Sequence, residues 1–216
     1  MRRIDLSHPI ADGTVTYPGL PGPVIEDHLS FEASAEHYAP GTEFRIGRIT
    51  MVANTGTYLD TPAHRFRDGH DLAQLPLESC ALLPAAVVDA GPGPIGPEAL
   101  GGIEVAGAAV LLRTGWSQHW GTARYGDVDH PFLTAEGAHH LVQAGARLVG
   151  IDSVNIDATD GGDRPAHTTL LAAGIPVVEH LTNLDQLPAS GATFTAVPVA
   201  VQGMATFPVR AFAAVA

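Results

Sequence analysis

The sequence predicts a mixed α/β fold, rich in strands, formed by a single domain over residues 1–216. The 216 residues are 45% hydrophobic and 16% charged, so the chain carries enough apolar side chains to bury a core. Its 24 glycines and 17 prolines are spread along the chain and indicate short elements joined by tight turns. Strand–helix–strand units are expected in the second half, and no internal repeat or linker divides the chain.

Apolar and β-branched runs predict the strands, and capping residues mark the helices. The expected strands are residues 43–53, 85–90, 108–113, 147–152, 175–179, 193–201 and 206–211. A helix is expected over residues 134–144, with Thr134 as its N-cap, Glu136 in its first turn and Gly145 as its stop. A second, short helix is expected over residues 165–173, ended by Gly174.

The charge balance and the residue types that are absent exclude several classes of function. The net charge is −12, from 11 basic and 23 acidic residues, which argues against nucleic acid or an anionic membrane surface as a partner. All 11 basic residues are arginine, so no lysine is present for a Schiff base or a P-loop. Cys80 is the only cysteine and reads as a buried structural thiol. Because it cannot form an internal disulfide, a cytoplasmic protein is expected.

Neither a signal peptide nor a membrane span is expected. The first residues, MRRIDLSHPIADG, lack the apolar run of a signal peptide. Residues 186–209 carry no charge, but Pro188, Pro198 and Pro208 interrupt them. Such a segment suits short strands with turns rather than a lipid-facing helix.

Two familiar nucleotide and hydrolase motifs are rejected. The run GPGPIG at residues 91–96 matches a dinucleotide-binding pattern, but Pro92 and Pro94 remove backbone donors that a pyrophosphate needs. These residues are therefore predicted to form a turn. The serine-hydrolase pattern GxSxG does not occur in the sequence.

The segment NTGTYLDTPAH at residues 54–64 is the first candidate for chemistry. It places Gly56, Asp60, Pro62 and His64 within eleven residues, directly after a predicted strand. Asp60 offers a hard oxygen ligand and His64 a titratable imidazole, which are the usual partners of a metal-activated water. The alternative is a strand-to-helix turn in which Asp60 only caps the helix.

A second candidate pair is His167 and Glu179, which bracket a short helix and a strand. One turn–helix–strand excursion can bring Glu179 back to the end of the sheet where His167 lies. Histidine and carboxylate together are ordinary ligands for zinc or manganese. The alternative is structural, with Glu179 ending a strand and His167 capping a helix.

Together these segments resemble a family of metal-dependent cyclases and hydrolases that includes bacterial kynurenine formamidase, isatin hydrolase and a trans-dienelactone hydrolase. The family signature is HxGTHxDxPxH, and the chain has NxGTYxDxPxH at residues 54–64. The opening DLSHPI, the YPG turn at residues 17–19, the HTTLL run from His167 and the strand end at Glu179 also match in kind and order. The resemblance implies a swivelling β/β/α fold, a homo-oligomer (dimer or tetramer) and hydrolysis of a small amide, lactam, lactone or ester.

The resemblance also implies roles for individual residues. Asp60, His167 and Glu179 fall on metal-ligand positions, and His64 falls on the general acid/base histidine. Asn54 and Tyr58 replace the histidines of two further ligand positions. An amide oxygen is a weak zinc ligand, and a tyrosine binds well only as phenolate, so one divalent ion (Zn²⁺ or Mn²⁺) is expected rather than two.

Two hypotheses follow from different classes of function. In the first, the chain is a metal-dependent hydrolase of a small molecule, with His64 as acid/base and Tyr58 as a hydrogen-bond donor to the oxyanion. In the second, it is a metal-free member that binds a small molecule or acts through His64, Tyr58 and Asp60 without an ion. The nearby Arg65 and Arg67 then either clamp a substrate carboxylate or pair with aspartates at the surface.

Overall fold

The computed structural model describes residues 1–215, and its elements are short, as the glycine and proline content predicts. The strands are β1 (Arg2–Asp5), β2 (Val24–Leu29), β3 (Ile46–Thr50), β4 (Tyr58–Asp60), β5 (Leu83–Asp89), β6 (Pro94–Ile95), β7 (Ala109–Arg113), β8 (Phe132–Leu133), β9 (Leu148–Ile151), β10 (Val177–Glu179), β11 (Ala192–Thr195), β12 (Thr206–Pro208) and β13 (Phe212–Val215). The α-helices are α1 (Phe31–Ala35), α2 (Pro97–Leu100), α3 (Ala135–Gln143) and α4 (Pro165–Ala172). Single 3₁₀ turns are η1 (Pro62–His64), η2 (Leu72–Gln74), η3 (Leu77–Ser79), η4 (Trp116–His119), η5 (Ala123–Gly126) and η6 (Leu184–Gln186).

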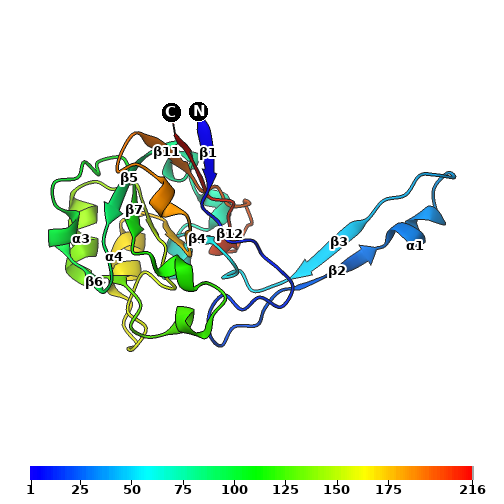
Figure 1. Cartoon of the computed structure of the whole chain (residues 1–216), viewed down its shortest axis with the longest axis horizontal. Helices are drawn as coiled ribbons and strands as arrows, with labels where there is room; N and C mark the ends of the chain where they lie inside the picture. The colour runs from blue at the N-terminus through cyan, green and yellow to red at the C-terminus, as the bar shows by residue number, and fades with distance from the viewer. Residues whose placement is uncertain (216) are drawn as a thin grey trace.

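Most of the strands join one mixed sheet, so the predicted strand-rich α/β class is confirmed. Within residues 1–215 this sheet has nine strands in the order β1-β13-β11-β5-β7-β9-β10-β4-β12. The central strands β5, β7, β9 and β10 run parallel, and the flanking strands run antiparallel to their neighbours. The two chain ends meet in the β1–β13 pair, which Figure 1 shows at one edge of the molecule.

Alternation along the central strands divides the core into two parts. Ala86 and Val88 of β5 face the cluster under α2, α3 and α4, whereas Ala85 and Val87 face the opposite cluster. That second cluster also takes in residues of β1 and β4, which lie far apart in the strand order. The sheet therefore curls around this core, and α3 and α4 cover its other face (Figure 1).

The predicted helices and central strands appear close to their expected bounds. The Oγ1 of Thr134 accepts a hydrogen bond from the backbone N–H of Gly137 and so caps α3. Gly145 and Gly174 follow the helices α3 and α4 with φ of +80° and +72°, the left-handed backbone that a stop glycine supplies. Residues 186–209 contain the short strands β11 and β12, as expected. None of the helices described in residues 1–215 has both the length and the apolar character needed to cross a membrane.

A two-stranded ribbon stands apart from the sheet. Strands β2 and β3 pair with each other, carry α1 at the tip and project away from the rest of the molecule (Figure 1). All residues of β3 are exposed, although the sequence marks this segment as an apolar strand. A lone two-stranded hairpin is only marginally stable in water, and pairing with the main sheet does not stabilise this arm.

The turn that carries His64 is closed tightly against itself. The backbone N–H of Ala63 donates to the carbonyl of His70, and that of Gly69 donates to Phe66. A Cβ on Gly69 would lie 2.5 Å from the carbonyl carbon of Pro62, so only glycine fits here.

Replacement of Gly69 by alanine is therefore expected to destabilise the protein by about 1–3 kcal/mol, the usual cost of overpacking. Urea denaturation measures this loss. The matched control is Gly161→Ala, because a Cβ there meets nothing within 4 Å. Equal effects of the two substitutions would contradict the tight closure.

Candidate active site

The candidate site lies where β4 runs antiparallel to β10. The register places Tyr58 opposite Glu179 and Asp60 opposite Val177. Because side chains alternate along a strand, Tyr58 and Asp60 leave one face of the sheet while Leu59 enters the core on the other. Asp60 is thus a fully buried strand residue, and the interpretation of it as a helix cap is wrong.

His167 reaches the same place from the first turn of α4. Its Nδ1 lies 2.7 Å from Oδ2 of Asp157, and the same carboxylate accepts the backbone N–H groups of Ala166 and His167. Asp157 thereby satisfies donors at the start of α4 and fixes the ring of His167 with Nε2 turned toward Asp60. His167 itself does not cap the helix, whose N-cap is Arg164, but Glu179 does end the strand β10, as the structural alternative expected.

The predicted residues converge on a single point. Nε2 of His167 lies 3.7 Å from Oδ2 of Asp60 and 3.6 Å from Oε1 of Glu179. Nδ1 of His64 lies 3.4 Å from the other oxygen of Asp60. One ligand atom from each of Asp60, His64 and His167 falls within 4.8 Å of the others, so this group can hold a metal ion.

Unpartnered polar atoms support that fit. In the part of the chain that the structure describes, the buried side-chain atoms with no hydrogen-bond partner are Nε2 of His8, Oδ2 of Asp60 and Nε2 of His167. The last two face each other across the point of convergence. A buried polar atom without a partner is costly, and an imidazole nitrogen with a carboxylate oxygen is a normal zinc or manganese donor set.

Buried negative charge dominates the electrostatics of the site. Asp60, Asp157 and Glu179 are at most 1% exposed and surround His167. Burial acts to lower the pKa of His167, but the hydrogen bond with Asp157 and the nearby carboxylates raise it to about 10. Burial has the opposite effect on a carboxyl group and raises the pKa of Glu179 to about 7. The site therefore favours a cation, either a proton or a metal ion, beside His167.

Tyr58 occupies the other side of Glu179 in a closed hydrogen-bond network. Its hydroxyl donates to Oε2 of Glu179 at 2.6 Å, while the backbone N–H of Ile156 donates to Oε1 at 2.7 Å. Burial, with the charges of Glu179 and Asp60, raises the pKa of Tyr58 well above its usual value, so the phenol keeps its proton.

His180 contacts the hydroxyl of Tyr58 and extends the hydrogen-bond network to Tyr125. Nε2 of His180 lies 3.2 Å from the Tyr58 hydroxyl, and Nδ1 lies 2.8 Å from the hydroxyl of Tyr125. Since the Tyr58 hydroxyl already donates its hydrogen bond to Glu179, it accepts one from Nε2 of His180. Nδ1 of His180 then accepts a hydrogen bond from the Tyr125 hydroxyl. His180 adopts a φ of 58°, a left-handed conformation that is uncommon outside glycine and is found at sites under tight constraint.

A cavity of about 310 Å³ opens over these groups. His64, Tyr58, His167 and Glu179 line it, together with Asn54 and the loop at residues 17–20. Of the residues that the sequence singled out for the site, Asn54, Tyr58, His64, His167 and Glu179 line this cavity, and His64 is partly exposed. Asp60 is fully buried and does not line it, but it contacts His64 and His167 from below the surface.

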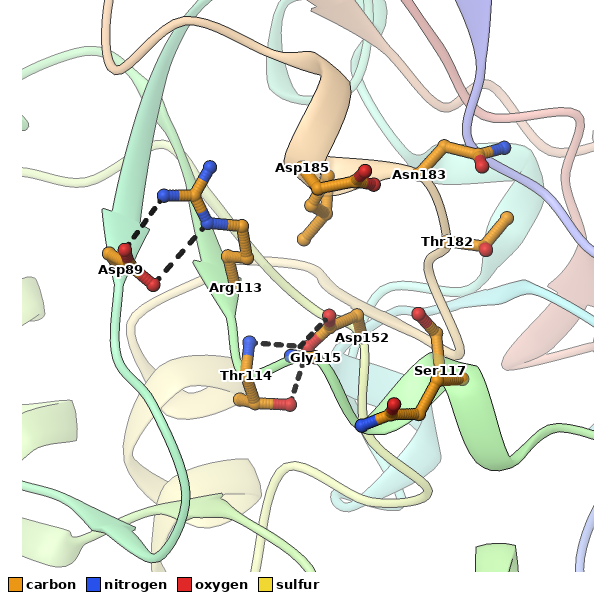
Figure 2. A pocket seen from close by; sticks show the side chains of 11 residues that line it. Asp89, Arg113, Thr114, Gly115, Ser117, Asp152, Thr182, Asn183 and Asp185 are labelled. Carbon is orange, nitrogen blue, oxygen red and sulfur yellow. Dashed lines mark hydrogen bonds and ion pairs between the residues drawn. The ribbon is translucent and has the colours of Figure 1, made fainter.

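A larger cavity of about 500 Å³ lies at the ends of β5 and β7 (Figure 2). Most of its charged groups are already paired: Arg113 bridges to Asp89, and Asp152 accepts hydrogen bonds from Thr114 and Gly115. None of the buried side-chain atoms without a partner in residues 1–215 belongs to its lining, whereas His167 lines the smaller cavity.

Sequence reasoning missed three residues that organise the site: Asp157, His180 and Thr206. Each is separated in the sequence from the group it contacts, and none belongs to a short motif. Only the position of Asp157, in the loop between a buried strand and a predicted helix, offered a local signal.

Comparisons with known proteins relate this chain to a family of enzymes. A family model described as "Putative cyclase" matches residues 4–158. The chain is 32% identical over 210 residues to a kynurenine formamidase of Bacillus cytotoxicus, covering 96% of this chain and 95% of that protein. A kynurenine formamidase of Salinibacter ruber is 30% identical, with 98% and 96% covered.

A solved structure agrees with these sequence matches. Isatin hydrolase A of Labrenzia aggregata, solved with bound benzyl benzoate, matches with a TM-score of 0.84 and 28% identity, covering 99% of this chain and 93% of that one. The homologues are hydrolases, which agrees with the expected class of enzyme.

The buried His180 also predicts a pH dependence of stability. Burial and the neighbouring His8 lower the pKa of His180 to about 3, below its ordinary value near 6.5. As the pH falls below 6.5 the unfolded chain binds a proton that the folded chain does not, so stability decreases.

In His180→Asn this contribution is absent, and the slope of unfolding free energy against pH between pH 5.5 and 4 should decrease by up to about 1.4 kcal/mol per pH unit. Urea denaturation at several pH values measures the slope. An identical slope in the parent and the variant would contradict the assignment.

Proposed function

We propose, on the premise that this chain belongs to the cyclase family, that it is a metal-dependent hydrolase of a small amide, lactam, lactone or ester. One observation carries the proposal: Oδ2 of Asp60 and Nε2 of His167 are buried, unpartnered within residues 1–215 and 3.7 Å apart. The identity to kynurenine formamidases and to an isatin hydrolase supports the type of bond. We further infer that residues 1–216 act as one domain in the cytoplasm, where the single Cys80 stays reduced.

We propose Asp60, His167 and Glu179 as ligands of one divalent ion, Zn²⁺ or Mn²⁺. Asn54 and Tyr58 would stand at ligand positions that no longer bind. The hydrogen bond from Tyr58 to Glu179 supports this, because a neutral phenol that donates its proton is not a metal ligand. A bound ion would supply Lewis-acid polarisation of the scissile carbonyl and a water of lowered pKa.

His64 is the proposed general acid/base. It lies at the edge of the cavity, where it can take a proton from the attacking water and return it to the leaving nitrogen or oxygen. Tyr58 lines the same cavity, and its hydroxyl would donate a hydrogen bond to the developing oxyanion instead of to Glu179. Asp157 keeps Nε2 of His167 aimed at the ligand position.

The alternative is a metal-free binding protein, and one observation favours it. The Tyr58 hydroxyl already donates a hydrogen bond to Glu179, so this side of the site is satisfied without an ion. Metal content separates the two functions.

Elemental mass spectrometry of protein purified without an affinity tag should find about one Zn²⁺ or Mn²⁺ per chain, because two buried donor atoms otherwise lack partners. Asp60→Ala and His167→Ala should lose the ion. The exposed Asp163→Ala is the matched control and should keep it. No ion after incubation with either metal would favour the binding protein.

His64→Ala should keep the ion and lose turnover by about 100-fold or more, since positioned acid/base groups contribute 10²–10⁴-fold. The assay uses a panel of an N-formylated arylamine, a lactone and an aryl ester. Loss of the ion in this variant would instead make His64 a ligand. Full turnover of every substrate by His64→Ala would exclude it from the reaction.

We also infer a homo-oligomer, a dimer or tetramer, in which the arm of β2, α1 and β3 meets a second copy. Ile25 and Ile49 are cross-strand partners in this arm and are 41% and 47% exposed. Two ion pairs, Arg45–Asp27 and Arg48–Glu26, join charged side chains of the arm to each other, and its exposed apolar side chains are what it would offer to a partner.

Light scattering should therefore give a parent mass of at least two chains, and Ile25→Glu combined with Ile49→Glu should shift it toward one chain. Val128→Glu, at a residue 62% exposed on the body, is the control and should leave the mass unchanged. A monomeric parent, or an unchanged mass in the double variant, would contradict the role of the arm.

A further inference from the structure

We propose that Thr206 is a positioning residue that fixes the tautomer of His64 and thereby leaves Nε2 of that ring for the reaction. The inference rests on the proposed function, in which His64 is the acid/base. It concerns a residue that no motif of the sequence marks.

The fold brings Thr206 to this place through the outer strand of the sheet. Strand β12 pairs antiparallel with β4, and Thr206 stands directly opposite Asp60. Both side chains are buried, with 3% and 0% exposure. Neighbouring backbone bonds hold the segment in register, because the N–H of Thr61 donates to the carbonyl of Ala205.

The hydroxyl of Thr206 bridges Asp60 and His64. It donates its proton to Oδ1 of Asp60, and its oxygen lies 3.0 Å from Nδ1 of His64. A hydroxyl has one proton and it is already given to the carboxylate, so Nδ1 must be the donor in the second bond. A neutral imidazole carries one N–H, and that N–H is therefore on Nδ1.

The consequence is a free lone pair on Nε2 of His64. The structure records no hydrogen-bond partner for Nε2 within residues 1–215, and the ring lines the cavity. Thr206 thus aims the base at the cavity, which is the orientation that removal of a proton from water requires.

The two carboxylate oxygens of Asp60 have different partners. Oδ1 accepts the hydrogen bond from the Thr206 hydroxyl, and Oδ2 remains without a partner beside Nε2 of His167. One carboxylate can therefore orient His64 through Thr206 and keep an oxygen for an ion. A direct bond from His64 to Asp60 is the weaker alternative, since that separation is 3.4 Å.

Two substitutions separate the hydroxyl from the shape of the side chain. Thr206→Ser keeps the hydroxyl, and Thr206→Val keeps the β-branched shape without it. In Thr206→Val we expect kcat to fall about 10- to 100-fold with little change in KM, the usual effect of losing a group that orients a site residue. Thr206→Ser should restore most of the activity, and both should keep the parent's metal content.

A spectroscopic readout tests the tautomer without any substrate. The ¹⁵N chemical shifts of His64, assigned by their loss in His64→Gln and recorded with Zn²⁺ at a pH where the ring is neutral, should report Nδ1–H in the parent and in Thr206→Ser. Thr206→Val should shift toward Nε2–H.

The parent measurement alone decides the matter if Thr206→Val does not fold. An Nε2–H tautomer in the parent would overturn the proposal, as would an unchanged tautomer in folded Thr206→Val or equal losses in the two variants. Absence of metal or turnover in the parent would overturn the proposed function instead, and the ¹⁵N result would still stand by itself.

Discussion

The burial of three carboxylates around one imidazole is the constraint on which the rest of this site depends. Asp60, Asp157 and Glu179 come from different segments and all face His167. Charges of one sign cannot be buried together without a compensating cation or hydrogen bonds. The backbone N–H groups at the start of α4 satisfy Asp157, and the fold leaves a gap between Asp60 and His167 that a cation would fill.

The site is asymmetric about His167. On one side, Glu179 is enclosed by the Tyr58 hydroxyl and the Ile156 N–H, and His180 stands behind Tyr58. On the other side, an oxygen of Asp60 is open. The hydrogen bond from the Tyr58 hydroxyl thus stabilises Oε2 of Glu179 on the first side, which leaves Oε1 of Glu179 and the open oxygen of Asp60 facing Nε2 of His167. This division gives a physical reason to expect one ion where the family signature offers more histidines.

Local signals in the sequence explain which parts were predictable. The helix α3 was predicted with its cap, because Thr134 and Gly137 are three residues apart and the bond is local. The pairing of β1 with β13 was not predicted, because it joins the two ends of the chain. The exposure of β3 was also not predicted, since the sequence pattern of an apolar strand is the same whether the strand joins a sheet or forms a projecting arm.

The same distinction applies to the site. Asp60 and His64 are four residues apart, and His167 and Glu179 enclose one helix and one strand, so each pair left a pattern. Thr206 acts on His64 from 142 positions away. Its role follows only from the register of β12 against β4, which the sequence does not display.

The central claim is that Oδ2 of Asp60 and Nε2 of His167 meet on an ion. Anomalous diffraction from crystals grown with Zn²⁺ or Mn²⁺ tests it most directly, because it locates the metal rather than counting it. The account predicts one strong peak about 2.0–2.2 Å from both atoms. Crystals with no peak there, or with the peak bound only by other residues, would contradict it.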